Sequence, residues 1–500
     1  MPARTTIGLA ALALALLATG AARPEECTIG VASGRATADG RPLLWKVRDN
    51  AGVPDNEVYR NTALTLPFIA VVSADGGPDS PAWMGANLRG FALVNANVDD
   101  LGAPASLANG EFMRLALGTC PSVREFLTLL EATDGLRDTH ANFGVIDTTG
   151  AALIVEASRD EFWIYDADAS APGFLIRTNF ACVDTAGAGI DGLAGEERFV
   201  RSTDLVEAWV GAGGLDLAQV VGRHARDFSD WACRPFPLPC YECGEPDSLY
   251  GWFDTYFSIC GGGTVSAAAI QGVAPPPAQE PAWLTTLWVH LGNPACTLAL
   301  PYWPAAPVPA VADGPGTAPL CDLANAIREG VVFHRPYYPR FVDSFALDDG
   351  QGGGLWSVLR PAEATVLAAA RTRLAGWRLA VPTVAAVLAF EDSLATAAHA
   401  LLVLDVVTDM PAAPAGRPLT AYPNPFNPAC TLAFDLAAAG RVQLTVHDLA
   451  GRRVARLLDE ARPAGPQQVA WHPDRLASGV YVARLAAPGV VAHRRLVLVR

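Results

Sequence analysis

The sequence has few charged residues and lacks an excess of basic ones. Asp, Glu, Lys and Arg together make up 17% of its 500 residues, whereas an average soluble protein has roughly 25%. The 36 Lys and Arg residues are outnumbered by 51 Asp and Glu residues, which gives a formal net charge of -15. This charge argues against nucleic acid as a partner, because contacts to phosphates need basic side chains. Hydrophobic residues make up 51%, so a disordered chain is excluded as well.

The signatures of several enzyme classes are also missing. The eight histidines show no metal-ligand spacing. The glycine-rich stretches 261–263 and 350–354 lack the Lys-Ser/Thr that follows in a phosphate-binding loop, and no Gly-x-Ser-x-Gly motif occurs. The sequence therefore predicts no nucleotide, metal or other cofactor.

The N-terminus has the three parts of a secretory signal peptide. Arg4 is followed by an apolar run from Ile7 to Leu17 and then by small residues up to Ala22. The run is too short to cross a bilayer, which takes about 20 apolar residues, and no later segment provides that length without interruption. We therefore expect a signal peptide over residues 1–22, a short propeptide over residues 23–26, and an exported mature protein without a membrane span.

Four of the ten cysteines lie close together in a stretch rich in Pro and Gly: Cys233, Cys240, Cys243 and Cys260. In an exported protein this spacing favours one or two disulfides. A zinc site is the alternative, but the four include one Cys-x-x-Cys pair and no histidine lies among them.

The length favours two or three domains, and the pattern of residues changes along the chain. Up to about residue 405 short strands alternate with helices, which predicts an α+β domain over residues 27–405. Residues 406–418 are rich in Pro and Ala and are typical of a linker, whereas residues 419–500 consist of brief alternating strands, as in a small β-sandwich. In the first domain we expect strands at 27–33, 42–47, 91–97, 143–147, 152–156, 162–165, 174–177, 264–273 and 285–291, and helices at 122–131, 215–228 and 361–400, the last broken at Pro382.

Cys27 lies a few residues after the expected signal-peptidase site. Cleavage of the Glu26–Cys27 bond would make it the first residue, with a free α-amine beside its thiol. An α-amine has a pKa of about 7.7–8.0, so it can take the thiol proton and later protonate a leaving amine. Asp49, at the end of the expected second strand, is a carboxylate that could hold the amine. A structural half-cystine is the plain alternative, and a lipid-modification site is another, although RPEE lacks the small and aliphatic residues that such a site needs.

The segment CTIGVASGRATADGRPLLWKVRD (Cys27–Asp49) resembles the start of N-terminal nucleophile (Ntn) amidohydrolases, in particular the isopenicillin-N acyltransferase-like and choloylglycine hydrolase/penicillin V acylase groups. Segments 84–97, 141–158, 174–181 and 196–201 resemble later motifs of the family in the same order. The resemblance spans about residues 27–405 and implies a four-layer αββα sandwich. It also implies hydrolysis or transfer of the acyl group of a linear, non-peptide amide through an acyl-Cys27 thioester.

The same resemblance implies roles for individual residues. Cys27 would be the nucleophile and, through its amine, the base, while Asp49 would orient that amine. Asn179 would donate to the oxyanion that forms on the substrate carbonyl.

For two further roles the sequence offers two candidate residues each. Asn97 is a candidate second oxyanion donor, but Asn95 lies two residues before it on the same strand face. Arg198 would position the carboxylate and the amine, with Arg201 as the alternative.

One departure and two alternatives concern the substrate. Choloylglycine hydrolases carry Arg three residues before the aspartate, where this chain has Lys46, which argues against bile acids and penicillins. The beginning of the segment also resembles cysteine dipeptidases of the superfamily. A non-enzymatic surface protein that keeps the fold for adhesion is the alternative from another class.

The tail resembles another family. AYPNPFNPACTLAFDL (Ala421–Leu436), VHDLAGRRV (Val446–Val454) and LASGVYVARL (Leu476–Leu485) are similar to the C-terminal sorting domains of type IX secretion and related immunoglobulin-like modules. This implies a partner in a secretion or surface-anchoring machinery, contacted through residues 419–500, and a secreted or cell-surface location. A passive β-sandwich is the alternative. The expected partner of the first domain is a small-molecule amide.

Overall fold

The computed structural model describes residues 26–499 except for internal gaps. The predicted signal peptide, residues 23–25 of the predicted propeptide, the predicted linker and Cys243 lie outside the described residues. The gaps are residues 75–76, 99, 102–107, 184–188, 239, 241–250, 277, 279, 315–316, 334–339, 351, 404–418, 423–425, 437–438, 449–452, 474–475 and 488–489.

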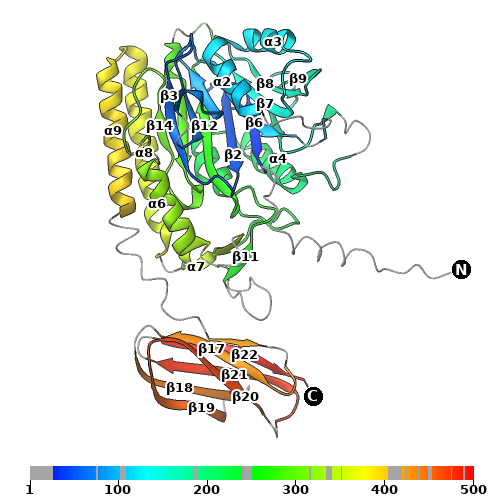
Figure 1. Ribbon diagram of the computed structural model, residues 1–500, viewed down its shortest axis with the longest axis vertical. Coiled ribbons are helices and arrows are strands. Elements are labelled where there is room, and N and C mark those ends of the chain that lie inside the picture. The colour runs from blue at the N-terminus through cyan, green and yellow to red at the C-terminus, as the bar shows by residue number, and fades with distance from the viewer. Residues whose placement is uncertain are drawn as a thin grey trace, which may run out of the picture.

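Two antiparallel sheets form the centre of the first domain (Figure 1). The six-stranded sheet has the order β10 (Phe174–Arg177), β1 (Thr28–Ala32), β2 (Leu43–Asp49), β12 (Thr264–Gln271), β13 (Thr286–Leu291), β14 (Leu300–Tyr302). The seven-stranded sheet follows the chain: β3 (Asn56–Asn61), β4 (Phe68–Ser73), β5 (Ala82–Asn87), β6 (Ala92–Asn97), β7 (Ala141–Ile146), β8 (Ala152–Ala157), β9 (Phe162–Asp166).

The two sheets face each other, since β2 contacts β6 and β7, and β13 contacts β3 and β5. Strands covered on both faces read as apolar runs rather than as alternating patterns. Every residue of β1, β6, β7, β8 and β13 is indeed buried. The predicted strands of this domain are confirmed to within two residues at each end. β3, β4, β5 and β14 were not predicted. β4 is a short apolar run, which does not distinguish a strand from a buried helix, whereas β3 is mostly polar and β14 has three residues.

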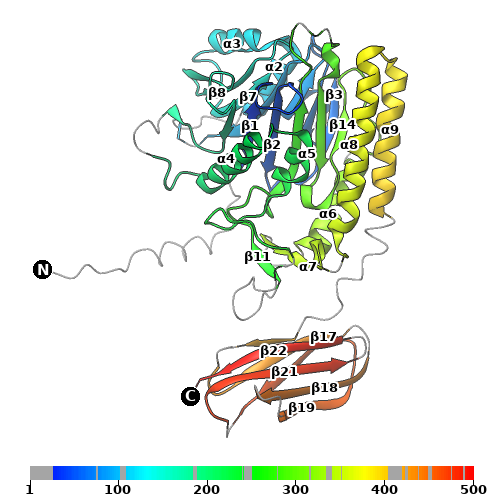
Figure 2. The same ribbon diagram turned by 180° about the vertical axis from the view of Figure 1, so that it is seen from behind.

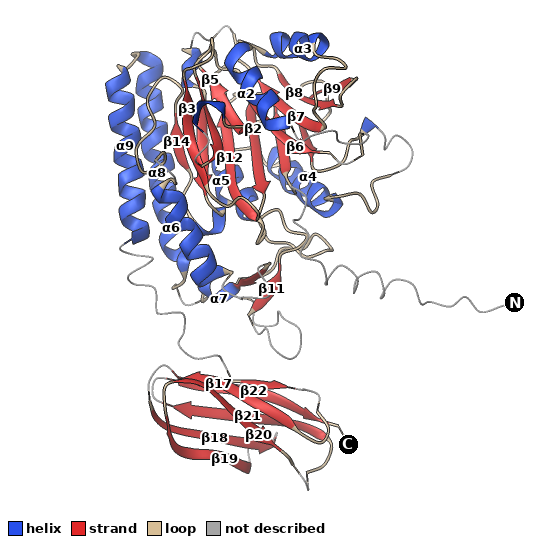
Figure 3. Cartoon of the chain, viewed as in Figure 1, coloured by secondary structure: helices blue, strands red, loops and turns tan. Residues whose placement is uncertain are grey.

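Helices cover the outer faces of both sheets (Figures 2 and 3). α2 (Asn109–Thr119) packs on β5 and β6, and together with α3 (Val123–Ala132) it encloses an apolar cluster on the seven-stranded sheet. On the six-stranded sheet, α4 (Glu196–Gly211) contacts β10 and α5 (Leu217–Gly222) contacts β12. The predicted helix 215–228 is wrong in length: α5 ends at Gly222, and a separate 3-10 turn covers His224–Arg226.

The long helical region is divided as predicted. α8 (Leu355–Leu379) and α9 (Val384–Leu401) are separated at Pro382, and the side chain of Thr383 caps α9 by accepting from the backbone of Ala386. The first helix begins before Pro361, which lies inside it. Of the helices that the structure describes, α9 alone is long and apolar enough to cross a membrane. The absence of a membrane span stays a prediction, although α9 contacts α6 and β14 of this domain.

The remaining elements of this domain are short. They are η1 (Gly77–Asp79), β11 (Trp252–Asp254) paired with β15 (Phe341–Asp343), η4 (Ala282–Leu284), η5 (Pro294–Cys296), α6 (Pro319–Ile327), η6 (Arg328–Val332) and α7 (Ser344–Leu347).

The C-terminal region is all-β, as predicted, with its own apolar core that includes Leu432, Phe434, Leu444 and Leu496. One sheet has the order β16-β17-β20 and the other β19-β18-β21-β22. β16 and β19 were not predicted. The strands are β16 (Thr420–Tyr422), β17 (Cys430–Leu436), β18 (Gly440–Asp448), β19 (Arg453–Arg462), β20 (Gly465–Trp471), β21 (Gly479–Ala487) and β22 (Val490–Leu498).

The predicted cysteine cluster does not contain two disulfides among its four cysteines. Cys233 and Cys260 carry free thiols, so the pairing of all four cysteines is wrong. Cys240 is disulfide-bonded. Cys260 is fully buried, and burial raises the pKa of its thiol well above the ordinary value. Because the thiolate is the reactive form, a thiol with a raised pKa is unreactive.

Candidate active site

Strand pairing brings Cys27 and Asp49 to the same end of the six-stranded sheet. Cys27 directly precedes β1, and Thr28 is paired with Val47 of β2. In this antiparallel register Cys27 lies opposite Arg48, one position from Asp49. Cys27 has no exposed surface.

Two of the predicted site residues, Asn179 and Arg198, contact Cys27. The backbone nitrogen of Cys27 donates to Oδ1 of Asn179 at 3.0 Å. Nη1 of Arg198 donates to the carbonyl oxygen of Cys27 at 2.7 Å, and Nη2 donates to the same Asn179 Oδ1 at 2.9 Å. Cys27 precedes β1, Asn179 lies in the turn after β10 and Arg198 lies in α4, so the sheet and its covering helix assemble the site together.

The turn that carries Asn179 is held from the opposite sheet. Nδ2 of Asn142, on β7, donates to the carbonyl oxygens of Thr178 and Phe180 at 3.0 and 2.9 Å. These two bonds bracket Asn179 and fix its backbone. Nδ2 of Asn179 in turn donates to the carbonyl oxygen of Asn97 at 3.0 Å, so β6 and β7 both support the turn.

Asn97 lies at the end of β6, beside this turn. Its Oδ1 accepts from Nδ2 of Asn109, the first residue of α2, at 3.1 Å. Asn109 is itself fixed, because its side chain exchanges hydrogen bonds with the backbone of His140. An amide whose oxygen is held in this way has a defined direction for its NH2 group.

The side chain of Asn95 has a different partner from that of Asn97. Its Oδ1 accepts from Nζ of Lys46 at 2.7 Å, and the same ammonium donates to the carbonyl oxygen of Trp83 at 3.3 Å. Lys46 and Arg48 are both fully buried between the sheets. The guanidinium of Arg48 lies 4.6 Å from the centre of the Trp83 ring, so two cations lie along β2 near Cys27.

The first turn of α4 directs Arg198 toward Cys27. Gly195, which precedes the helix, has φ = 83°, and a Cβ atom there would lie 2.6 Å from Nη2 of Arg198. Glycine therefore lets the guanidinium lie against the backbone. Nη1 also donates to Oγ1 of Thr28 at 3.1 Å. Arg201 instead forms a two-bond ion pair with Asp227, at 2.8 and 2.7 Å, so Arg198 is the arginine that reaches Cys27.

Asp49 lies at the end of β2, where β2 is paired with β12. Its Oδ1 accepts from Oγ1 of Thr264 at 2.5 Å. This hydrogen bond directs the carboxylate toward β12, and its contact with the amine of Cys27 stays a prediction.

Four supporting residues escaped the sequence interpretation: Thr28, Asn109, Asn142 and Thr264. Asn142 lies within a segment that resembles the family, and a polar residue inside an otherwise apolar strand was a usable signal. Asn109 and Thr264 contact the site through chain segments that are distant in the sequence, so no local pattern could identify them. Within the described residues there is no group of three or more His, Cys, Asp or Glu side chains that could hold a metal ion.

Comparison with known proteins identifies the C-terminal domain. Residues 420–499 match the family model of the secretion system C-terminal sorting domain. This domain marks proteins that the type IX secretion system exports to the cell surface or beyond, so the predicted location is confirmed. No curated protein matches the chain.

Among solved structures, the chain is similar to a variant of the conjugated bile acid hydrolase from Clostridium perfringens, with 14% identity and a TM-score of 0.32 over 53% of this chain and 89% of the hydrolase. It is also similar to the penicillin V acylase from Agrobacterium tumefaciens, with 14% identity and a TM-score of 0.32 over 55% of this chain and 85% of the acylase. Both are enzymes of the kind that the sequence motifs resemble.

Proposed function

We propose that the exported protein is a cysteine Ntn amidohydrolase or N-acyltransferase that cleaves a linear amide through an acyl-Cys27 thioester. The observation that carries the proposal is the hydrogen bond from the backbone nitrogen of Cys27 to Asn179 Oδ1. This nitrogen is an amide while the Glu26–Cys27 bond is intact, and it occupies the position of the α-amine in the processed chain. The base that the chemistry needs would therefore be held from the start.

The architecture supports the same proposal. In the proposed four-layer αββα sandwich, the two facing sheets would be the inner layers and the helices on their outer faces the outer layers. In such a sandwich a nucleophile at the start of an inner strand lies between the sheets, where side chains from both can reach it. Asn97 of one sheet and Cys27 of the other both contact Asn179, which accepts from the nitrogen of Cys27 and donates to the carbonyl oxygen of Asn97.

Removal of the propeptide would be the first chemical step. The Cys27 thiolate attacks the carbonyl carbon of Glu26, the C–N bond breaks as the nitrogen takes up a proton, and a thioester with a free α-amine remains. Water then hydrolyses the thioester and releases the preceding segment as a carboxylic acid. A carboxylate oxygen of Glu26 lies 4.0 Å from Nη2 of Arg198, so this release would also free the guanidinium from a competing anion.

Acylation by substrate would follow the same course. The α-amine takes the thiol proton, and the sulfur attacks the carbonyl carbon of the amide. Asn179, with Asn97 as second donor, would stabilise the oxyanion, and the amine would return the proton to the leaving nitrogen. Water or an amine would then attack the thioester and restore the thiol.

Arg198 and Asp49 would act on the amine rather than on the substrate carbonyl. A guanidinium close to an amine disfavours its protonated form, because two like charges repel each other. Arg198 would thus help to keep the amine neutral and able to accept a proton. Asp49 would orient the amine from the end of β2, with Thr264 fixing the carboxylate.

The test uses the secreted protein. Intact mass and N-terminal sequencing should show Cys27 as the first residue, and a panel of N-acyl amino acids, short peptides and β-alanyl amines should include a substrate that wild type cleaves and Cys27→Ala does not. Cleavage confined to dipeptides would favour the dipeptidase alternative. An active protein that retains residues before Cys27 would contradict the mechanism, because it would lack the amine.

A further inference from the structure

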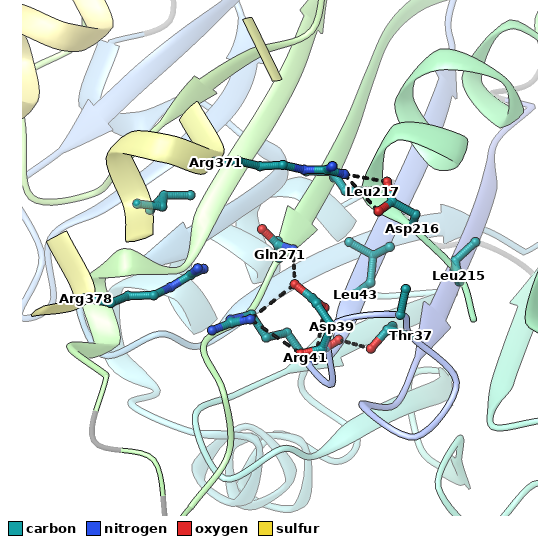
Figure 4. Close-up of a pocket in the computed structure, with 12 residues that line it drawn as sticks. Thr37, Asp39, Arg41, Leu43, Leu215, Asp216, Leu217, Gln271, Arg371 and Arg378 are labelled. Carbon is teal, nitrogen blue, oxygen red and sulfur yellow. Dashed lines mark hydrogen bonds and ion pairs between the residues drawn. The ribbon is translucent and has the colours of Figure 1, made fainter. Parts of the chain in front are cut away.

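A cavity lies at the other end of β1 from Cys27. It has a volume of about 310 Å³ and is lined by the turn between β1 and β2, the residues before α5, the end of β12 and one face of α8 (Figure 4). The five residues of β1 alone span about 16 Å, so this cavity is separate from the proposed active site. Its volume is at the lower end of the range for small-molecule sites.

The carboxylates beside the cavity are already engaged. Asp39 accepts from Nη1 of Arg41 at 3.3 Å and from Nε2 of Gln271 at 2.8 Å. Asp216 caps α5 and accepts from Nη2 of Arg371 at 2.7 and 2.8 Å. Both acidic side chains on the cavity wall therefore have protein partners.

Two arginines of α8 keep unused donors. Arg371 donates to Asp216 through Nη2 alone. Its Nε and Nη1 therefore have no protein acceptor among the described residues. Arg378 has one contact there, from Nε to Oε1 of Glu280 at 3.4 Å, and this atom makes no hydrogen bond. Its side chain is only 24% exposed, and burial, followed by the charge of Arg41, lowers the pKa of Arg378. Glu280 is an anion that Arg378 shares with Arg41, so the carboxylate of a ligand would stabilise the second of these two partly desolvated cations.

The wall between the two arginines is apolar. Leu374 lies between Arg371 and Arg378 on the same face of α8, three residues from one and four from the other. Leu43, from β2, faces the cavity from the opposite side, as Figure 4 shows. Seven residues of helix separate the two arginines by about 10 Å, so one ligand could reach both only if it carries an anionic group at each end.

We propose that this cavity binds a small dicarboxylate, with one carboxylate on Arg371, the other on Arg378 and a short aliphatic chain over Leu374. Guanidinium groups suit carboxylates because two N–H groups match two oxygens. The aliphatic chain distinguishes this ligand from inorganic phosphate, which would contact one arginine and leave the leucine uncovered.

The test is calorimetric titration of the full-length secreted protein with adipate at low ionic strength. Wild type should bind adipate in a saturable manner. Arg371→Gln and Arg378→Gln should each raise the dissociation constant at least tenfold. Arg373→Gln is the matched control, because Arg373 is exposed on the same helix and its guanidinium lies over Phe390 instead. This variant should bind as wild type does.

Four outcomes would overturn the proposal: no saturable binding of adipate, equal binding by Arg371→Gln, equal weakening by Arg373→Gln, or tighter binding of inorganic phosphate than of adipate. Arg371→Gln guards against a folding artefact, because its side chain is 57% exposed and its loss should leave the melting temperature unchanged.

Discussion

The guanidinium of Arg198 donates to the carbonyl oxygen of Cys27 at 2.7 Å, although the two residues are 171 positions apart in the sequence. The same group donates to Asn179, whose side-chain oxygen accepts from the nitrogen of Cys27. Both backbone polar atoms of Cys27 are therefore fixed by side chains from other elements. In the proposed mechanism this restraint would fix the direction of the α-amine relative to Asn179 and Arg198.

Replacement of Cys27 by Ala removes the proposed nucleophile. We expect amide cleavage to fall to background, and residues 23–26 to stay attached if the protein processes itself. Cys27→Ser should keep the fold and retain a small fraction of the activity, because a hydroxyl is a weaker nucleophile than a thiol. Intact mass and turnover are the measurements. Turnover by Cys27→Ala at the wild-type rate would eliminate the mechanism.

Asn179→Ala removes the proposed oxyanion donor and the acceptor for the Cys27 nitrogen. We expect kcat to fall by about 10²–10³, with a small change in KM and only modest loss of stability. Asn325→Ala is a suitable control, since Asn325 is a partly buried amide that contacts Pro54 and Asp55. Steady-state kinetics of both variants provide the comparison. Similar rates for the two would show that Asn179 has no part in the reaction.

Arg198→Lys tests the geometry of the guanidinium while keeping its charge. An ammonium cannot reproduce three bonds to Cys27, Thr28 and Asn179 in a fixed plane. We expect kcat to fall by about tenfold or more, whereas Arg201→Lys should lose less than about threefold because Arg201 pairs with Asp227. Equal losses in the two variants would place Arg198 outside the reaction.

Glu391 gives a prediction about pH and stability. It is buried on α9, where its Oε1 accepts from the backbone nitrogen of Trp303 at 2.7 Å. Burial raises the pKa of Glu391 from 4.5 to about 8. Between these values the folded state binds more protons than the unfolded state, so stability decreases as pH rises from 4.5 toward 8.

Glu391→Gln keeps the acceptor for Trp303 but cannot ionise. We expect its melting temperature to equal that of wild type near pH 5 and to exceed it by about 2–4 °C near pH 8.5. Thermal unfolding at the two pH values measures this difference. An equal difference at both values would show that ionisation of Glu391 is not the cause.

Cys27, Asn179 and Arg198 were predicted from motifs that resemble those of a family, and the structure brings the three residues into contact. Their role in catalysis stays a prediction. Asn109 and Thr264 could not be found, because each contacts a predicted site residue through one hydrogen bond, to Asn97 12 residues away and to Asp49 215 residues away. Such bonds leave no periodicity in the sequence.

Apolar runs, proline and short motifs act locally, so the sequence was enough to predict the all-β C-terminal region and most inner strands. Which of Asn95 and Asn97, and which of Arg198 and Arg201, contacts Cys27 or Asn179 depends on the tertiary structure. Residues two apart share a strand face, and residues three apart share a helix face, so each pair is equivalent in pattern. The choice depends on which side chain meets Lys46, Asp227 or Cys27, and those partners are set by how the sheets and α4 pack.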